Sequence, residues 1–189
     1  MHGIVLSALK DFVEEQAGAE AWNHLLAEAN LTGKAYRPIQ EYPDDEAADL
    51  FAAASRKTSL PLDSLLEAFG EFLTPTLMRL YGHLARPEWR CLEFIEHAEH
   101  AIHKVVRVNI SGARPPVLAV SRFGPNEISV DYSSHRKMCG LAKGIVRGVA
   151  RHYRETIDLQ EHACMNRGDP ACRIAVRLLP PTVGGKSQP

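Results

Sequence analysis

Three hydrogen-bond donors stand at alternate positions of one short segment, as Tyr132, Ser134 and Arg136. Alternate residues of an extended segment point to the same face. That face would carry a phenol, a hydroxyl and a guanidinium, and the planar guanidinium fork suits carboxylates and phosphates. The spacing therefore predicts an anion-binding edge, with a strand end that carries surface polar residues as the alternative.

A second group of residues has the composition of a metal site. His162 and Cys164 are two positions apart and share one face of a strand, Cys172 returns on the facing strand, and Cys139 begins a helix. Three thiolates and an imidazole form a closed tetrahedral set suited to zinc. A shift of one residue would bring Glu161 in place of His162. Three unlinked buried thiols, or thiols that respond to oxidation, are the alternatives.

Helical periodicity dominates the first 110 residues, where apolar residues recur three and four positions apart. The pattern predicts one helix from Ile4 to Gly18 and a short one over residues 22–29. A third helix follows, which Asp44 or Asp45 can cap. A fourth begins after Pro61, is interrupted at Pro75 and continues helically from Leu77 to Leu84. A long helix after Pro87 carries His103 beside its apolar stripe.

The period changes to that of strands after residue 116. Residues 117–123 and 128–132 predict one hairpin, 137–153 a long helix, and 156–164 with 172–179 a second hairpin. The expected fold class is α+β. It comprises a helical N-terminal lobe (1–60) and a C-terminal lobe (61–182) with a four-stranded antiparallel sheet packed by long helices. Residues 183–189 are rich in Pro, Gly and Ser and predict a disordered tail.

Composition limits the classes of protein that fit. The chain has 189 residues, which suits one domain, and 45% of them are hydrophobic. A formal net charge of -1 gives no nucleic-acid footprint. No apolar run reaches the roughly 18 residues that a membrane helix needs, and no signal-peptide pattern stands at the N-terminus. A cytoplasmic protein that binds neither membrane nor nucleic acid is expected, and its four cysteines favour metal or redox chemistry over a disulfide framework.

His103 lies thirteen residues before Pro116, and Pro115 and the Tyr-x-Ser-x-Arg segment follow it in order. This combination resembles the haem-nitric oxide/oxygen binding (H-NOX) family, the gas-sensing domain also found in soluble guanylate cyclase. The resemblance covers nearly the whole chain from Met1. It implies a haem b between the two lobes, with His103 as the ligand of the iron. Its propionates would be bound by the three donors, Tyr132, Ser134 and Arg136.

The resemblance also implies roles for apolar residues. Pro115 would press on the porphyrin, and Ile4, Val5 and Leu9 of the N-terminal helix would line the distal wall. Oxygen-binding members of the family place a tyrosine five residues after the arginine of the signature, where this chain has Leu141, and its neighbour Ile145 is also apolar. A ferrous haem without a distal donor should bind nitric oxide and carbon monoxide well and oxygen poorly. Some bacterial members of the family carry a zinc site of the cysteine and histidine composition in this lobe.

The expected function is that of a nitric oxide sensor and not of an enzyme. By resemblance, ligand binding opposite His103 weakens the iron–histidine bond and shifts the lobes, and the partner is a histidine kinase, or else a diguanylate cyclase or phosphodiesterase. An oxygen sensor is the alternative if Tyr81 or another donor reaches the distal face, and a zinc-thiolate redox sensor is a third possibility. A haem peroxidase would need a distal acid–base pair that the sequence does not offer.

Overall fold

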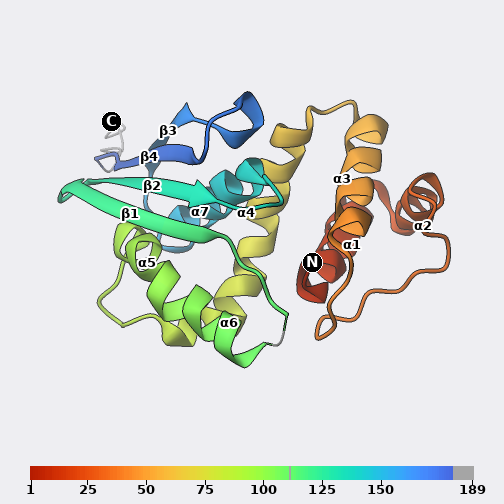
Figure 1. The fold of residues 1–189 in the computed structure, drawn as a ribbon, viewed down its shortest axis with the longest axis horizontal. Coiled ribbons are helices and arrows are strands. Elements are labelled where there is room, and N and C mark those ends of the chain that lie inside the picture. The colour runs from red at the N-terminus through yellow and green to blue at the C-terminus, as the bar shows by residue number, and fades with distance from the viewer. Residues whose placement is uncertain (111, 181–189) are drawn as a thin grey trace, which may run out of the picture.

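The computed structural model describes residues 1–110 and 112–180. Three helices, α1 (Gly3–Ala17), α2 (Ala19–Glu28) and α3 (Asp44–Thr58), gather at one end of the molecule, and the sheet lies at the other end (Figure 1). The long helix α4 (Leu62–Tyr81) runs between them and is followed by the short turn η1 (Gly82–Leu84). The expected tail, residues 183–189, lies outside the described residues.

The N-terminal helices enclose the first of two apolar cores. Its fully buried side chains include Leu6 and Leu9 of α1, Leu50 of α3, and Phe69 of α4. Each such side chain contributes about 1.5–3 kcal/mol by leaving water. This core includes residues of α4 as far as Leu73. It therefore extends past residue 60, where the sequence placed the end of the N-terminal lobe.

The C-terminal half contains one antiparallel sheet in the order β1-β2-β4-β3. Its strands are β1 (Val117–Gly124), β2 (Glu127–Ser133), β3 (Ile157–Ala163) and β4 (Cys172–Leu178). On β2 the buried residues Ile128, Val130 and Tyr132 alternate with more exposed ones, because successive side chains of a strand face opposite sides. The predicted α+β class and its four-stranded antiparallel sheet are confirmed.

The second core lies between this sheet and the helices that cover it. One is α7 (Cys139–His152), and the other is the segment formed by α5 (Cys91–Ala98), η2 (Glu99–His103) and α6 (Lys104–Asn109). Cys91 is fully buried in this core. The segment is not one regular helix, because η2 is a π-helical turn and His103 is its last residue. Such turns are rare and often occur at functional sites.

The predicted interruption at Pro75 is wrong, because α4 continues from Leu62 to Tyr81 with the proline inside it. A proline removes one backbone hydrogen bond and crowds the preceding turn. Tertiary packing outweighs that cost, since Leu73 on one side of Pro75 is buried in the first core and Met78 on the other side packs against the second.

The predicted cap of α3 is also wrong. Pro43 occupies the N-cap position and has no side chain that can cap the helix, although Asp45 Oδ1, inside the first turn, accepts from the Glu46 N–H at 3.0 Å. The Asp44 carboxylate instead accepts hydrogen bonds from the Met1 amine and from Arg136, which is 92 residues away. The Asp44 carboxylate, which the local pattern assigned to the start of α3, is therefore part of a long-range ion pair.

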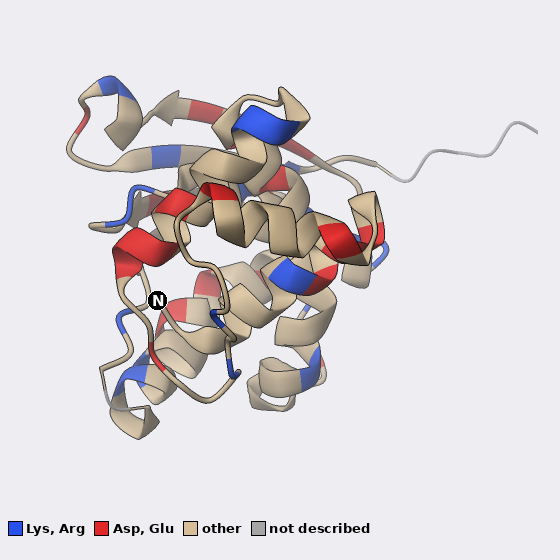
Figure 2. Cartoon of the chain, turned by 90° about the vertical axis from the view of Figure 1, so that its right-hand side faces the viewer, with Lys and Arg blue, Asp and Glu red and all other residues tan. Residues whose placement is uncertain are grey.

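Acidic and basic residues are interspersed over the face shown in Figure 2, in keeping with a net charge near zero. In residues 1–110 and 112–180, no helix is both long and apolar enough to span a bilayer.

A candidate haem site and a thiol cluster

A cavity of about 290 Å³ opens between α1, α4, α7, the η2 turn and the first two strands. Apolar side chains form most of its wall. With one exception, the residues that the sequence singled out for a haem line it, namely His103, Pro115, Tyr132, Ser134, Arg136, Ile4, Val5, Leu141 and Ile145. The exception is Leu9, which does not line the cavity because it is fully buried in the first core. The tertiary structure therefore brings together residues that span 141 positions of the chain.

The wall made by α4 and α7 is apolar where these helices face the cavity. Leu73 and Leu77 come from α4, and Leu141 and Ile145 come from α7. Thr74 also lines the wall, but its hydroxyl donates to the Gly70 carbonyl at 2.8 Å within the helix.

Tyr81, at the C-terminal end of α4, is a second polar residue that this helix contributes to the cavity lining. Burial raises the pKa of its phenol, so the hydroxyl keeps its proton at neutral pH. It lies seven residues beyond Thr74, about 10 Å further along the helix axis. The phenol is therefore a possible donor at one end of the cavity.

The opposite edge of the cavity is polar and carries the Tyr-x-Ser-x-Arg residues. The Arg136 guanidinium donates through Nε to Asp44 at 2.7 Å and through Nη1 to the Arg114 carbonyl at 2.6 Å. Tyr132 is only 4% exposed, and burial raises the pKa of its phenol to about 12. At neutral pH this edge therefore presents a cation and two neutral hydroxyls.

Asp44 connects that edge to the N-terminal helices. Its carboxylate accepts from the Met1 amine at 2.6 Å, from Arg136, and from His135 Nε2 at 2.7 Å. Burial alone would raise the pKa of Asp44, but these hydrogen bonds hold it well below its usual range. Local sequence pattern gives no signal for the pairing of Asp44 with Arg136, because the two residues are 92 positions apart.

His103 reaches the cavity from the last position of η2. Its Nδ1 lies 3.2 Å from Glu99 Oε2. Burial lowers the pKa of the imidazole and outweighs the opposing effect of Glu99, so the ring is neutral at pH 7. A neutral imidazole is the form that binds a metal ion.

These features fit a haem. The macrocycle needs an apolar slot, its iron needs a neutral imidazole at the wall, and its two propionates need donors at the rim. The apolar wall provides the space for the macrocycle, His103 provides the imidazole, and the edge at Arg136 provides the donors for the propionates. The imidazole and the guanidinium both line the same cavity.

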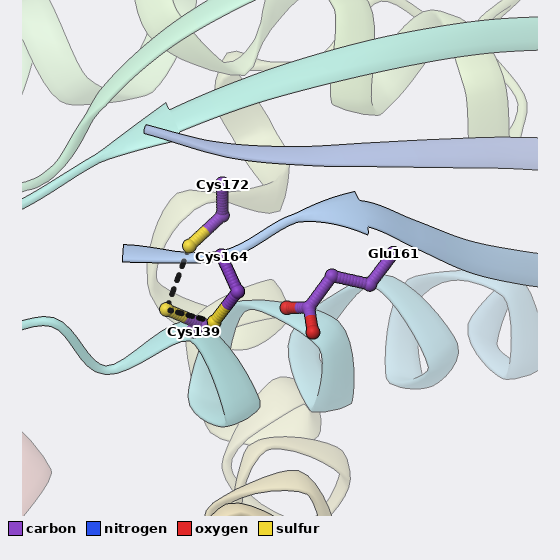
Figure 3. Close-up of side chains that lie close together, drawn as sticks. All are labelled: Cys139, Glu161, Cys164 and Cys172. Atoms are coloured by element: carbon purple, nitrogen blue, oxygen red, sulfur yellow. Dashed lines mark hydrogen bonds between the residues drawn. The ribbon is translucent and has the colours of Figure 1, made fainter. Parts of the chain in front are cut away.

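A separate cluster of thiols lies where α7 begins and the β3–β4 connection crosses it (Figure 3). The Cys139 Sγ lies 2.7 Å from the Cys172 Sγ and 3.8 Å from the Cys164 Sγ. All three residues are buried and free of disulfides. Burial, reinforced by the neighbouring sulfur, raises the pKa of Cys139, and burial also raises that of Cys172. These two thiols are thus neutral without a nearby cation.

The fourth member of the cluster is Glu161, whereas His162 is exposed and points elsewhere. Among the described residues, the structure therefore brings Glu161 to the thiols and not His162, which is the alternative that a shift of one residue offered. The register of β3 against β4 shifts between Glu161 and Ala163, and this bulge changes which residue faces the thiols. Only the tertiary structure reveals such a bulge.

The Glu161 carboxylate is only partly satisfied by the protein. Its Oε2 pairs with Arg167 at 2.8 Å, and Oε1 is buried without a hydrogen-bond partner among the described residues. The amine of Lys143 is the nearest cation to Oε1, at 3.7 Å. Buried polar atoms without a partner are rare, so this oxygen points to a ligand that the protein alone does not supply.

Glu99 and Glu161 are the residues near these two sites that sequence reasoning missed or left open. Glu99 stands four positions before His103, a spacing that places two side chains on the same helix face. A carboxylate at that distance from a candidate metal ligand is the signal that could have identified it.

The fold and the cavity together define a class, proteins that hold a flat cofactor between a helical lobe and a lobe built on a four-stranded sheet. The Haem-NO-binding family matches residues 2–161. An H-NOX protein from S. oneidensis in the Fe(II)NO ligation state superposes with a TM-score of 0.89, at 24% identity, over 95% of this chain and 100% of that one. An unliganded Fe(II) H-NOX mutant from K. algicida gives 0.87, at 22% identity, over 96% and 98% of the two chains.

A curated relative, "Soluble guanylate cyclase 89Da" of Drosophila melanogaster, is 21% identical over 162 residues, which are 85% of this chain. The chain spans only 24% of the length of that relative. Because the family match covers most of the sequence, the chain belongs to the Haem-NO-binding (H-NOX) family, whose domains bind haem and sense gases.

Proposed function

We propose that this protein is a sensor of nitric oxide, with a ferrous haem b bound by His103 and held at its propionates by Tyr132, Ser134 and Arg136. The haem iron supplies the site at which a diatomic gas binds. His103 contributes a neutral imidazole, and the polar edge contributes charge-assisted hydrogen bonds to the two carboxylates. The domain acts as a sensor and not as an enzyme.

The mostly apolar wall of α4 and α7 is the observation that favours nitric oxide over oxygen as the ligand. Bound oxygen is partly negative and gains from a hydrogen-bond donor, whereas nitric oxide and carbon monoxide need none. Leu141 stands where a donor would be expected, and Ile145 lies one turn further along α7. The hydroxyl of Thr74 is already bonded to its own helix.

Oxygen sensing is the second candidate, and one observation favours it, because Tyr81 lines the cavity and keeps its proton. A phenol that reached the gas would stabilise an oxygen adduct. Tyr81→Phe removes only that hydroxyl and therefore separates the two functions.

Absorption spectra of the reduced protein, alone, in air and with nitric oxide, test the proposal. We expect a haem spectrum that changes with nitric oxide and stays unchanged in air, and a His103→Gly variant that recovers the spectrum only with added imidazole. A stable oxygen complex that disappears in Tyr81→Phe would replace nitric oxide sensing by oxygen sensing. Protein that takes up no haem would refute the haem site.

We also propose that the signal passes to a separate protein, a histidine kinase or an enzyme of cyclic-di-GMP turnover. The family resemblance supports this step. Autophosphorylation of a candidate kinase, measured with the unliganded and the nitric oxide-bound protein, tests it. Equal kinase rates in both states would exclude that partner.

A zinc site formed by Cys139, Cys164, Cys172 and Glu161 is a further part of the proposal. The supporting observation is the buried Oε1 of Glu161 beside three clustered thiols. Four donors of this kind suit zinc, which stabilises thiolates that burial would otherwise keep protonated. The short approach of Cys139 to Cys172 also suits a redox response of the same thiols.

Metal analysis of matched variants distinguishes a zinc site from a redox response of the same thiols. We expect one zinc per chain in the wild type and in Cys91→Ala, whose thiol is buried away from the cluster, and none in Cys172→Ser. Zinc content that falls in Glu161→Gln and not in His162→Gln would identify the fourth ligand. Unchanged zinc in Cys172→Ser would exclude the site. After treatment with an oxidant such as hydrogen peroxide, a loss of the mass of two hydrogen atoms, which forms one disulfide while the oxidant is reduced, would favour the redox response.

A further inference from the structure

Glu99 occupies an unusual position beside the candidate haem ligand. It is the first residue of the π-helical turn that ends at His103. Its carboxylate accepts three hydrogen bonds, from His103 Nδ1 at 3.2 Å, from Arg107 Nη1 at 2.6 Å and from the Leu118 backbone N–H at 3.0 Å. Three separate segments of the chain thus meet at one side chain.

The contacts assign the two nitrogens of the His103 ring different tasks. A carboxylate only accepts hydrogen bonds, so Nδ1 must carry the proton that Glu99 receives. The lone pair of the neutral ring is then on Nε2, the nitrogen that remains for a metal. Glu99 in this way selects the tautomer that can serve as a ligand.

Glu99 also anchors the turn that carries His103 to the sheet. Leu118 belongs to the edge strand β1, and its N–H binds the same oxygen that faces the imidazole. Arg107 binds the other oxygen and also donates to the Pro116 carbonyl at 2.9 Å, just before that strand. Side chains of η2 and α6 are therefore clamped to the start of β1.

The alternative is that Glu99 is an ordinary ion pair. Exposed pairs contribute little, about 0–1 kcal/mol, and their removal leaves the surroundings unchanged. Here the Glu99 side chain is 18% exposed and the His103 side chain 20%. The partly buried carboxylate contacts the imidazole directly, which makes an effect on His103 measurable apart from stability.

We propose that Glu99 is the positioning residue for His103, which orients the imidazole and increases its electron donation, so that the bond from Nε2 to the haem iron resists rupture. Carboxylates act on metal-bound histidines in this way in other proteins. The inference rests on the proposed function, in which His103 binds haem. It makes Glu99 one determinant of how readily a gas releases His103.

The iron–histidine stretching band of the reduced, unliganded protein in resonance Raman spectra measures the effect directly. We expect the band to move to lower frequency in Glu99→Gln, because a neutral amide is a weaker acceptor than a carboxylate. The reduction potential of the haem should rise, and the five-coordinate share of the nitrosyl complex should increase. Glu96→Gln is the matched control, since Glu96 lies on the preceding helix and pairs with Arg122 instead.

A second variant distinguishes electronic tuning from loss of structure. Arg107→Met removes the cation that competes for Glu99, so the carboxylate accepts more strongly from His103. The band should then move to higher frequency, opposite to Glu99→Gln. Shifts of both variants in the same direction, or a Glu99→Gln band equal to that of the wild type, would overturn the inference.

The experiment keeps the two proposals apart. If the wild-type protein binds haem but shows no iron–histidine band, or keeps that band in His103→Gly, the proposed ligand is wrong. If the wild-type band is present, disappears in His103→Gly and is unaffected by Glu99→Gln, only the role of Glu99 is refuted. Should Glu99→Gln fail to fold, the Arg107→Met shift alone decides, because an unshifted or lowered band contradicts the inference.

Discussion

Gly144→Ala should destabilise this protein because α4 and α7 pack with their backbones in contact at that point. A Cβ atom on Gly144 would lie 2.8 Å from the carbonyl carbon and 2.9 Å from the Cα of Glu67, and closer still to the Glu67 carbonyl oxygen. These are backbone atoms of α4, so no side-chain rotation can relieve the clash. Gly70 makes the reciprocal contact, since its Cβ would lie 2.8 Å from the Ile145 amide nitrogen.

The expected magnitude follows from two opposing effects. Overpacking against backbone costs about 3 kcal/mol, the upper part of the usual range, because the helices must separate. Replacing glycine by alanine inside a helix returns about 1 kcal/mol. The net loss is about 2 kcal/mol in the free energy of unfolding, which lowers the Tm of a domain of this size by about 4–8 °C.

Thermal unfolding followed by circular dichroism measures this change. Gly82→Ala is the control, because Gly82 has a helical φ of -60° at the end of α4 and its Cβ would meet only a flexible Met78 methyl group at 3.7 Å. Its Tm should stay equal or rise slightly. If Gly144→Ala melted at or above the wild-type temperature, the close backbone approach of the two helices would be refuted.

Three further results follow from the two sites. Leu141→Tyr should increase the affinity for oxygen by about tenfold or more, through one hydrogen bond of roughly 1.5–3 kcal/mol, and an absorption change of the reduced protein under rising oxygen pressure, absent or weaker in Leu141→Phe, would check it. Asp44→Asn should lose roughly 1 kcal/mol in the free energy of unfolding at pH 7. Because the folded-state pKa of Asp44 is lowered, its contribution is complete above its ordinary value of 3.8 and is lost as the pH falls further. Denaturant titrations at pH 7 and pH 3 should therefore show the gap between wild type and variant narrowing, and a constant gap would contradict the pairing. Chelation of zinc should lower the Tm of the wild type and leave that of Cys172→Ser unchanged, and an equal response of both proteins would argue against a structural metal.

The sequence predicted much of the architecture because periodicity reports local structure directly. The strands of the two hairpins and the helix between them begin and end within two residues of the bounds that alternation and helical spacing indicated. The residues predicted for a haem site came from spacing and family resemblance together, and the structure places all of them except Leu9 at one cavity. What spacing could not decide was local geometry that depends on distant contacts.

The sequence by itself determined the fold class, the family and which side chains could meet a haem, because these depend on residue types and on periods of two to four positions. The tertiary structure decided which partners those side chains have. The Asp44 side chain does not cap α3 as predicted but pairs with Arg136, 92 residues away, since an ion pair between the halves of the molecule outweighs a local hydrogen bond. A bulge in β3 places Glu161 and not His162 beside the thiols. The helix α4 continues through Pro75 because its residues on both sides of the proline are packed in a core. In each case the pairing or packing of one segment against another determined the outcome, and the period of a single segment does not report it.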